Sequence, residues 1–402
     1  MLRFSRGDVM SELPKILTRG VSQIMPSADK LAELMASRKM KLYLGIDPTG
    51  NQLTLGHAVV LRKLQQFVEA GHEVILLIGN GTVKIGDPTG KDKTRPMMTD
   101  EQIEANFKTW REQASAILDF DKIEVVYNAD WLDKLKFDDL VKLMAKFTVQ
   151  QMLERDMFAE RLKNNQPIFL HELIYPLLQG YDSVVLEVDL ELGGNDQLFN
   201  MMVGRQLLGE MKNREKFVLT TPLLIGTDGR KMGKSLHNFI PLNSSPEDLF
   251  GALMSIKDEV MREYFELLTD IPQTEIESLE SQVKNGELNP MEMKKQLAKE
   301  ITIWLHGTEA ADSAQKHFEK TVQQAEIPSE LPTLKLDNKT ETLLDIVMKS
   351  KVVSSKSEAR RLIEQGGVEL NQRKINDPWQ ILECQNGDVI RVGRRNYFEI
   401  KK

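Results

Sequence analysis

Four short stretches of the chain are almost continuously apolar, and their length is typical of strands rather than helices. Runs of this kind, bounded by glycine or polar residues, predict strands that are covered on both faces, as in a parallel sheet. The four predicted strands are 41–46, 73–79, 123–127 and 183–188.

Between these strands, apolar residues recur at helical spacing. In the stretch 55–70, Leu61, Leu64 and Phe67 fall on one face, and Gly71 follows as a stop. A second helix begins after Thr99, where Gln102 three residues later completes a capping box. Strands that alternate with helices of this length predict a Rossmann-like α/β domain with a parallel sheet, which we assign to residues 1–240.

The pattern changes after residue 240. Pro246 follows Ser245 as the first residue of a helix, and helical spacing continues to about residue 325, so 241–325 is predicted to be an α-helical domain. The stretch 326–340 is polar, contains two prolines and is predicted to be a linker. Two short helices and several short strands are expected in 341–402, which makes it a small α+β domain.

Charge is unevenly distributed over the 402 residues. The net charge is −7, yet the segment 341–402 holds 12 basic and 9 acidic residues. A net-basic module on an acidic body is compatible with a contact to a phosphate backbone, although an excess of this size is also ordinary for a surface. The single cysteine, Cys384, cannot form an internal disulfide. No apolar stretch is long enough for a membrane span, and the N-terminus lacks a secretory signal pattern, so a cytoplasmic protein is expected.

Two segments carry residues suited to nucleotide chemistry. Thr54-Leu55-Gly56-His57 stands where a loop enters a helix, a place where free backbone N–H groups bind anions. The segment 231–235, Lys-Met-Gly-Lys-Ser, places Lys231 and Lys234 around a flexible pair and could close over a polyphosphate. It is not a P-loop, because Asp228 stands where that motif requires its first glycine.

Taken together, the two segments resemble the signature motifs of class I aminoacyl-tRNA synthetases. Three further stretches, 43–49, 175–182 and 193–197, are similar to those of the tyrosyl-tRNA synthetases, as is the loop 85–91. The basic end resembles the S4-type RNA-binding domain of the bacterial tyrosyl enzymes. The resemblance therefore covers nearly the whole chain. It implies a tyrosine–tRNA ligase that activates L-tyrosine with ATP and then transfers it to the 3′ end of tRNA(Tyr).

The resemblance also implies roles for individual residues. The tyrosine site would be formed by Tyr43 and Asp182 at the phenol, by Asp87, Tyr175 and Gln179 at the ammonium group, and by Gln197 near the carboxylate. The ATP site would be formed by Asp47, Thr49, Gly56, His57, Gly193, Asp196, Lys231 and Lys234, with Thr54, His57 and the two lysines serving catalysis. Contacts to tRNA would come from Lys351, Lys356, Arg360, Arg361 and Arg373.

Two positions depart from the family pattern. Thr54 stands where the family usually has the first histidine of its HIGH motif, and it can donate a hydrogen bond but carries no charge. Leu198 replaces a tryptophan, which suggests local repacking. The resemblance further implies a homodimer built through the insertion 130–180, Mg²⁺ held mainly by the ATP phosphates, and no metal ligands on the protein.

Three other readings remain at this stage. A tryptophanyl-tRNA synthetase shares the fold and motifs, but Tyr43, Asp182 and the S4-like end argue against it. A non-catalytic RNA-binding relative would be expected to have lost the lysines of 231–235. A coenzyme-forming nucleotidyltransferase would not need the S4-like end.

Overall fold

The structure is a computed structural model, and it describes residues 15–88, 98–233, 236, 238–323, 331–336, 341–353, 355–393 and 396–401. The chain divides after Thr308 into two compact units, which are described separately. The mixed α/β composition with a parallel sheet, a helical region and a small C-terminal α+β domain confirms the predicted fold class.

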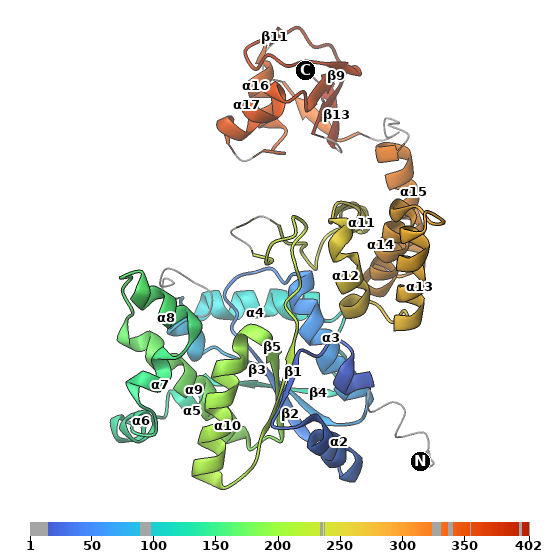
Figure 1. Ribbon diagram of the computed structural model, residues 1–402. Coiled ribbons are helices and arrows are strands. Elements are labelled where there is room, and N and C mark those ends of the chain that lie inside the picture. Colours follow the sequence, from blue (N-terminus) through green and yellow to red (C-terminus); the bar gives the residue numbers. More distant parts are fainter. Residues whose placement is uncertain are drawn as a thin grey trace. The chain divides into compact units, whose positions relative to one another are not determined.

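The first unit is built on a six-stranded sheet (Figure 1). Its strand order is β1-β6-β5-β2-β3-β4, and every neighbouring pair is parallel except β1 with β6. The central strands are apolar along most of their length because both faces are covered, as the sequence pattern predicts. The strands are β1 (Gln23–Met25), β2 (Lys41–Ile46), β3 (Glu73–Ile78), β4 (Ile123–Tyr127), β5 (Leu190–Gly194) and β6 (Phe217–Thr221).

Helices pack on this sheet and continue beyond it. Helix α4 begins with the predicted capping box of Thr99 and Gln102, and α11 begins with Ser245 as its N-cap. The helices are α2 (Ala28–Ser37), α3 (Leu55–Glu69), α4 (Asp100–Ala114), α5 (Ala129–Leu132), α6 (Phe137–Met144), α7 (Val149–Leu153), α8 (Asp156–Lys163), α9 (Leu170–Leu186), α10 (Leu198–Lys212), α11 (Pro246–Met254), α12 (Met261–Leu268), α13 (Gln273–Lys284) and α14 (Pro290–His306).

The predicted strand 183–188 is wrong. Residues up to Leu186 belong to helix α9, and the next strand is β5, which starts at Leu190. Helix α9 packs against α10, and its Leu186 packs with Tyr43 and Ile75 of the sheet, so most of its last two turns are buried. A helix covered on several sides reads as a continuous apolar run, which periodicity alone does not separate from a buried strand.

Helices α9 and α10 cross at two glycines. A β-carbon added at Gly180 would lie 3.0 Å from the backbone nitrogen of Gly204. A β-carbon at Gly204 would lie 2.7 Å from Lys216 Nζ and 2.8 Å from Ser183 Oγ. These separations are shorter than carbon contacts allow, so glycine at both positions permits the close approach of the two helices.

The second unit contains a five-stranded sheet of order β10-β9-β12-β13-β7 and a two-stranded pair, β11 with β8. Its core includes Leu343, Ile363, Val368 and Ile390, all fully buried. The elements are α15 (Thr308–Phe318), β7 (Thr333–Lys335), β8 (Glu341–Thr342), α16 (Leu343–Lys349), α17 (Lys356–Glu364), β9 (Val368–Leu370), β10 (Arg373–Lys374), β11 (Ile381–Leu382), β12 (Val389–Val392) and β13 (Asn396–Lys401).

Part of the expected linker 326–340 contributes to this sheet. Strand β7 lies within that segment and pairs in parallel with β13, with Leu334 opposite Ile400. Leu334 and Leu336 are both buried in the C-terminal core. Within the described residues, no helix has the length and apolar character needed to cross a membrane.

A buried lysine in the first unit makes its stability sensitive to pH. Lys63 on α3 is 4% exposed, and its Nζ donates to the carbonyl oxygens of Ile16 at 2.8 Å and Arg19 at 2.7 Å. Burial, with the nearby charges of Arg62 and Arg19, lowers the pKa of Lys63 to about 7. Between that value and the ordinary lysine pKa near 10.5, the unfolded chain binds a proton that the folded chain does not.

We therefore expect the contribution of Lys63 to the free energy of unfolding to rise with pH above 7, by at most about 1.4 kcal/mol per pH unit. Urea unfolding at pH 7.5 and 9 should give a steeper increase for the native protein than for Lys63→Met. Lys212→Met, a change at an exposed position, should retain the native slope. Equal slopes for the native protein and Lys63→Met would show that Lys63 does not titrate in this range.

Candidate active site

A cavity of about 310 Å³ lies where β2, β5 and α9 of the first unit meet. Its walls carry most of the residues that the sequence assigns to tyrosine and ATP. The predicted residues that line it are Tyr43, Asp47, Thr49, His57, Asp87, Tyr175, Gln179, Asp182, Gly193, Asp196 and Gln197.

Helix α9 presents one face to this cavity. Tyr175, Gln179 and Asp182 are spaced by four and three residues, so their side chains lie on the same side of the helix. Tyr43 comes from the middle of β2 and is fully buried, beside Ile75 and Leu77 of the neighbouring strand. The chain thereby brings a phenol from the sheet and a carboxyl group from the helix to the same wall.

The Asp182 carboxyl group is held by two donors. Trp131 Nε1 donates to its Oδ1 at 2.8 Å, and Asn128 Nδ2 donates to its Oδ2 at 3.2 Å. Burial raises the pKa of Asp182 well above its usual range, and these two hydrogen bonds oppose that shift. The donors fix the plane of the carboxyl group and leave it able to accept a further hydrogen bond from the cavity.

Two other carboxylates of the cavity already have partners. Tyr175 donates from its hydroxyl to Asp47 Oδ2, and Thr82 donates to Asp47 Oδ1, both at 2.8 Å. Gln197 Nε2 donates to Asp87 Oδ2 at 2.8 Å.

A buried guanidinium and an amide complete this wall. Arg155 NH2 lies 3.6 Å from the Oδ1 of the Asp87 carboxylate. Gln179 Oε1 is buried and, among the described residues, accepts no hydrogen bond. An unmatched buried acceptor beside carboxylates suits a donor group on a ligand, such as an ammonium.

Asp196 also lines the cavity and has a lysine beside it. Lys231 Nζ lies 3.7 Å from Asp196 Oδ2 and is itself largely exposed. Burial raises the pKa of Asp196, and the charge of Lys231 opposes that shift. The second predicted lysine, Lys234, and the loop positions 89–91 lie outside the described residues.

The start of α3 places His57 at the cavity wall. His57 Nδ1 accepts from the backbone N–H of Thr54 at 3.1 Å, so a neutral ring carries its proton on Nε2 and can donate from there. Thr54 Oγ1 lies 2.9 Å from the same Nδ1, and Thr54 is 5% exposed. Thr54 thus orients His57, and its own side chain does not line the cavity. Gly56 lies beside Thr54 and Met232.

Sequence reasoning did not find several residues of this site. Asn128 and Trp131 hold Asp182, and Thr82 holds Asp47. Ser183 and Glu191 are buried next to Tyr43. Ser183 immediately follows Asp182 on α9, and Glu191 is a charged residue inside an apolar strand. The charge of Glu191 within an otherwise apolar stretch is a sequence signal of its role.

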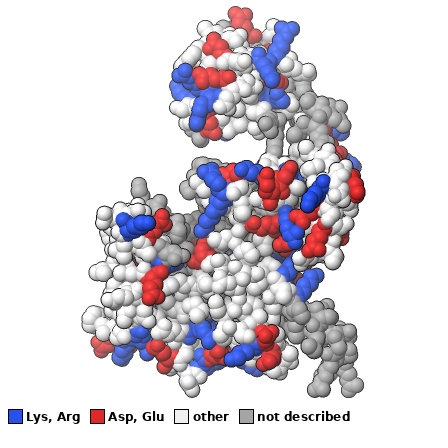
Figure 2. Space-filling view, in the orientation of Figure 1, with Lys and Arg blue, Asp and Glu red and all other residues white. Residues whose placement is uncertain are grey.

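The five predicted tRNA-binding residues lie on the surface of the second unit. All are exposed, and Lys356, Arg360 and Arg361 belong to α17. Arg360 Nε donates to Glu364 Oε1 at 2.7 Å within the same helix. Lys351 precedes that helix, and Arg373 begins β10. Figure 2 shows Lys and Arg side chains on the visible face of this unit, with acidic side chains among them.

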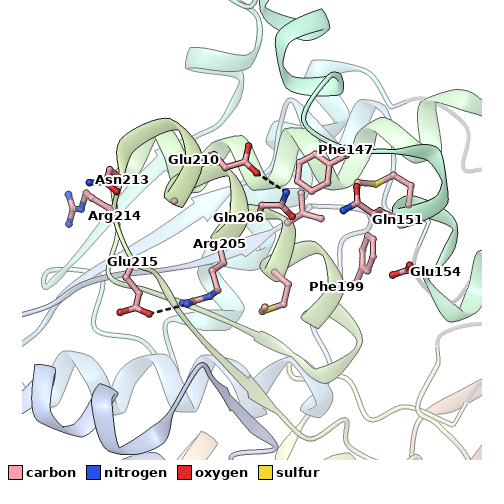
Figure 3. Close-up of a pocket in the computed structure, with 14 residues that line it drawn as sticks. Phe147, Gln151, Glu154, Phe199, Arg205, Gln206, Glu210, Asn213, Arg214 and Glu215 are labelled. Carbon is pink, nitrogen blue, oxygen red and sulfur yellow. Dashed lines mark hydrogen bonds and ion pairs between the residues drawn. The ribbon is translucent and has the colours of Figure 1, made fainter.

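A second, larger hollow lies between α7 and α10 and measures about 670 Å³. Figure 3 shows Phe147 and Phe199 close together in it, with Gln151 nearby. Its rim is polar, where Gln206 donates to Glu210 and Arg205 to Glu215. None of the predicted site residues lines it, and the larger volume therefore does not mark the site of chemistry.

Comparison with known proteins matches both units. The family model described as class I tRNA synthetases (W and Y) matches residues 35–323, and one for the C-terminal domain of tyrosine–tRNA ligases matches 322–400. The tyrosine–tRNA ligase of Dehalococcoides mccartyi is 46% identical over 96% of this chain and 98% of its own length. That of Thermotoga maritima is 45% identical over 97% of each chain.

Solved structures agree in fold. A tyrosyl-tRNA synthetase from Archaeoglobus fulgidus, solved with L-tyrosine, has a TM-score of 0.62 at 23% identity and covers 77% of this chain and all of its own. A C-terminally truncated mitochondrial tyrosyl-tRNA synthetase from Coccidioides posadasii has a TM-score of 0.61 at 22% identity, covering 77% of this chain and 95% of its own.

Proposed function

Because the chain belongs to the class I tRNA synthetases, and among them to the tyrosine–tRNA ligases, we propose that the cavity between β2, β5 and α9 is the site of both steps of that reaction. In the first step the carboxylate of tyrosine attacks the α-phosphorus of ATP, which gives tyrosyl-adenylate and releases pyrophosphate. In the second step the 3′-terminal ribose of tRNA(Tyr) attacks the adenylate and releases AMP.

The observation that carries this assignment is the polarity of the cavity. One wall holds a buried phenol, Tyr43, and a buried carboxyl group, Asp182, which can accept the proton of a substrate phenol. Asp87 and the unmatched Gln179 Oε1 can receive an ammonium group. An amino acid with a cationic head and a neutral hydroxyl group is complementary to this arrangement. A substrate that lacks the hydroxyl is rejected because it leaves buried polar groups unpaired, and tyrosyl-tRNA synthetases are the well-known example of this effect.

Of the remaining residues, Tyr175 is assigned to the ammonium group and Gln197 to the carboxylate of tyrosine, and the others are assigned to ATP. Asp196 would bind the ribose, and Asp47, Thr49, Gly56 and Gly193 would surround the nucleotide. His57 would donate from Nε2 to a phosphate. Mg²⁺ would be held mainly by the phosphates of ATP, since it keeps most of its oxygen ligands from substrate and water. Among the described residues, no group of three or more His, Cys, Asp or Glu side chains could hold a metal ion.

Catalysis in this proposal needs no general base, because the attacking carboxylate is ionised at neutral pH. The protein contributes orientation and stabilisation of charge on the departing pyrophosphate. Exchange of labelled pyrophosphate into ATP is the direct test. We expect exchange that depends on tyrosine, with tryptophan inactive as the control. Exchange that depended on tryptophan would overturn the assignment.

Lys234 is expected to act in the transition state. Lys234→Ala should slow adenylate formation by about 100- to 1,000-fold, because the loss of one positioned donor to developing charge has that size. The dissociation constant of tyrosine from the Lys234→Ala variant should equal that of the native protein. Single-turnover kinetics measures the first quantity, and tyrosine titration measures the second.

Arg230→Ala is the matched control for Lys234→Ala, since Arg230 belongs to the same loop and its Nε donates to Asp228 at 2.7 Å. It should retain a near-native rate. A native rate in Lys234→Ala would remove the lysine from the mechanism.

We further propose that the protein is a cytoplasmic homodimer that joins through residues 130–180. Large apolar side chains are exposed there in unusual number, with Phe137 at 78% and Leu170 at 80%. A concentration of exposed large apolar side chains in one region of the chain is compatible with an interaction site. The other exposed apolar residues of the region are Val141, Met144, Val149, Leu162 and Phe169.

Sedimentation velocity tests the homodimer. The native protein should sediment as a dimer, and Leu170→Asp should shift it towards monomer, because a charge in an apolar interface remains without a partner. Met291→Asp, at an exposed apolar residue of α14, is the control and should remain dimeric. A native protein that sediments as a monomer would contradict the proposal.

A further inference from the structure

Beside Tyr43 lies a network of buried polar groups, of which Glu191 also lines the cavity and accepts from Gln179 Nε2 at 3.4 Å. Tyr43 and Glu191 are register partners on the adjacent parallel strands β2 and β5. Lys216, immediately before β6, forms an ion pair with Glu191, and both side chains are almost completely buried. Ser183 of α9 joins them and is fully buried as well.

Distances connect these groups in a chain. Lys216 Nζ donates to Ser183 Oγ at 2.8 Å, and Ser183 Oγ lies 2.9 Å from the hydroxyl of Tyr43. The separation between Ser183 Oγ and Glu191 Oε2 is longer, at 3.4 Å. Lys216 can approach Ser183 only because Gly204 of α10 has no side chain at that point.

The chemistry of an ammonium group gives this chain a direction. An ammonium donates and cannot accept, so Ser183 Oγ must accept from Lys216. Ser183 has one proton of its own, which can reach the oxygen of Tyr43 at 2.9 Å or Glu191 Oε2 at 3.4 Å. Because Glu191 Oε2 is already paired with the ammonium group of Lys216, the shorter hydrogen bond to Tyr43 is favoured. Tyr43 then directs its own proton away from Ser183. Burial raises the pKa of Tyr43 well above its usual value, so that proton is retained.

We propose that Lys216 is a positioning residue for recognition of the tyrosine hydroxyl. By donating to Ser183, it orients the two hydroxyl groups so that Tyr43 donates to the oxygen of the substrate phenol. The substrate phenol donates its own proton to Asp182, whose two oxygens both accept. This inference rests on the proposed placement of the phenol between Tyr43 and Asp182.

The ion pair between Lys216 and Glu191 also explains why the buried ammonium group of Lys216 is needed. Without the ammonium group, Ser183 would donate its hydrogen bond to the carboxylate of Glu191. Tyr43 would then donate its own hydrogen bond to Ser183. The substrate phenol, which has one proton, would face acceptors at both Tyr43 and Asp182. Phenylalanine makes no use of either interaction, so the effect is specific to tyrosine.

The test measures the ratio of kcat/KM for tyrosine to that for phenylalanine in pyrophosphate exchange. Ser183→Ala should lower this ratio about tenfold, the size of one hydrogen bond. Lys216→Met should lower it about ten- to a hundredfold, because it leaves a buried acceptor unmatched. Adding Glu191→Gln to Lys216→Met should recover most of the loss, since the amide can donate to Ser183 in place of the ammonium.

A structural role alone would lower activation of both amino acids equally and leave the ratio unchanged, which would overturn the inference. Lys212→Met, which removes an exposed lysine paired with Glu187, is the matched control and should keep the native ratio. If Lys216→Met does not fold, Ser183→Ala decides the question, because it keeps the ion pair.

Tyr43→Phe distinguishes a failure of the role of Lys216 from a failure of the proposed placement of the substrate phenol. If it lowers the ratio while Ser183→Ala and Lys216→Met do not, only the role of Lys216 fails. If Tyr43→Phe also leaves the ratio unchanged, the placement of the phenol fails with it.

Discussion

Asp182→Asn is expected to lower kcat/KM for tyrosine in pyrophosphate exchange by about 100- to 1,000-fold. The Asp182 carboxyl group receives one hydrogen bond on each oxygen, from Trp131 and from Asn128. An asparagine must turn its NH₂ group towards one of these donors, whichever way it is oriented. The variant therefore loses a carboxyl acceptor for the substrate phenol and also places two donors against each other in a buried site.

Two further variants serve as the control and the rescue for this prediction. Asp130→Asn makes the same chemical change at an exposed position of α5 and should leave activity unchanged. Trp131→Phe, combined with Asp182→Asn, removes one opposing donor and should recover part of the loss. Activation of tyrosine within twofold of native in Asp182→Asn would show that this carboxyl group does not bind the hydroxyl.

The fold could be predicted from the sequence wherever the buried positions of a helix or strand follow the period of that element. The apolar run of β3 and the one-sided spacing of α3 both give their elements correctly, because burial matches the period of the structure. The stretch 183–188 fails for the opposite reason. Leu186 and Val184 are buried within a helix that is covered on several sides, and their pattern carries no period.

The site was predictable where chemistry and local sequence coincide. Tyr175, Gln179 and Asp182 were assigned through the resemblance to the family, and their spacing of four and three residues places them on one helix face. Ser183 and Lys216 could not be found in the same way. They are 33 residues apart and meet only through the crossing of α9 and α10. Their polar character gave no indication of burial, since serine and lysine are ordinary surface residues.

Removal of the C-terminal unit beyond α15 is expected to separate the two steps of the reaction. A protein that ends at Gln323 keeps every described residue of the cavity and the segment matched by the synthetase family model. It ends before β7, so the C-terminal sheet is removed as a whole. We expect tyrosine-dependent pyrophosphate exchange within about twofold of native, because no described residue that lines the cavity lies beyond residue 201, and Lys231 beside Asp196 is retained as well.

Charging of tRNA(Tyr) should fall in the shortened protein by about 100-fold or more at physiological salt, because phosphate contacts supply much of the affinity for nucleic acid. In the full-length protein the exposed side chains of Lys351, Lys356 and Arg361 are three of the five proposed contacts. Each change to glutamine should weaken tRNA binding and reduce the slope of log affinity against log salt by about one. Lys401→Gln, which removes an exposed lysine of β13 near Glu399, is the control and should keep the native slope. Native charging by the shortened protein would mean that the C-terminal unit does not bind the tRNA, since no other segment was removed.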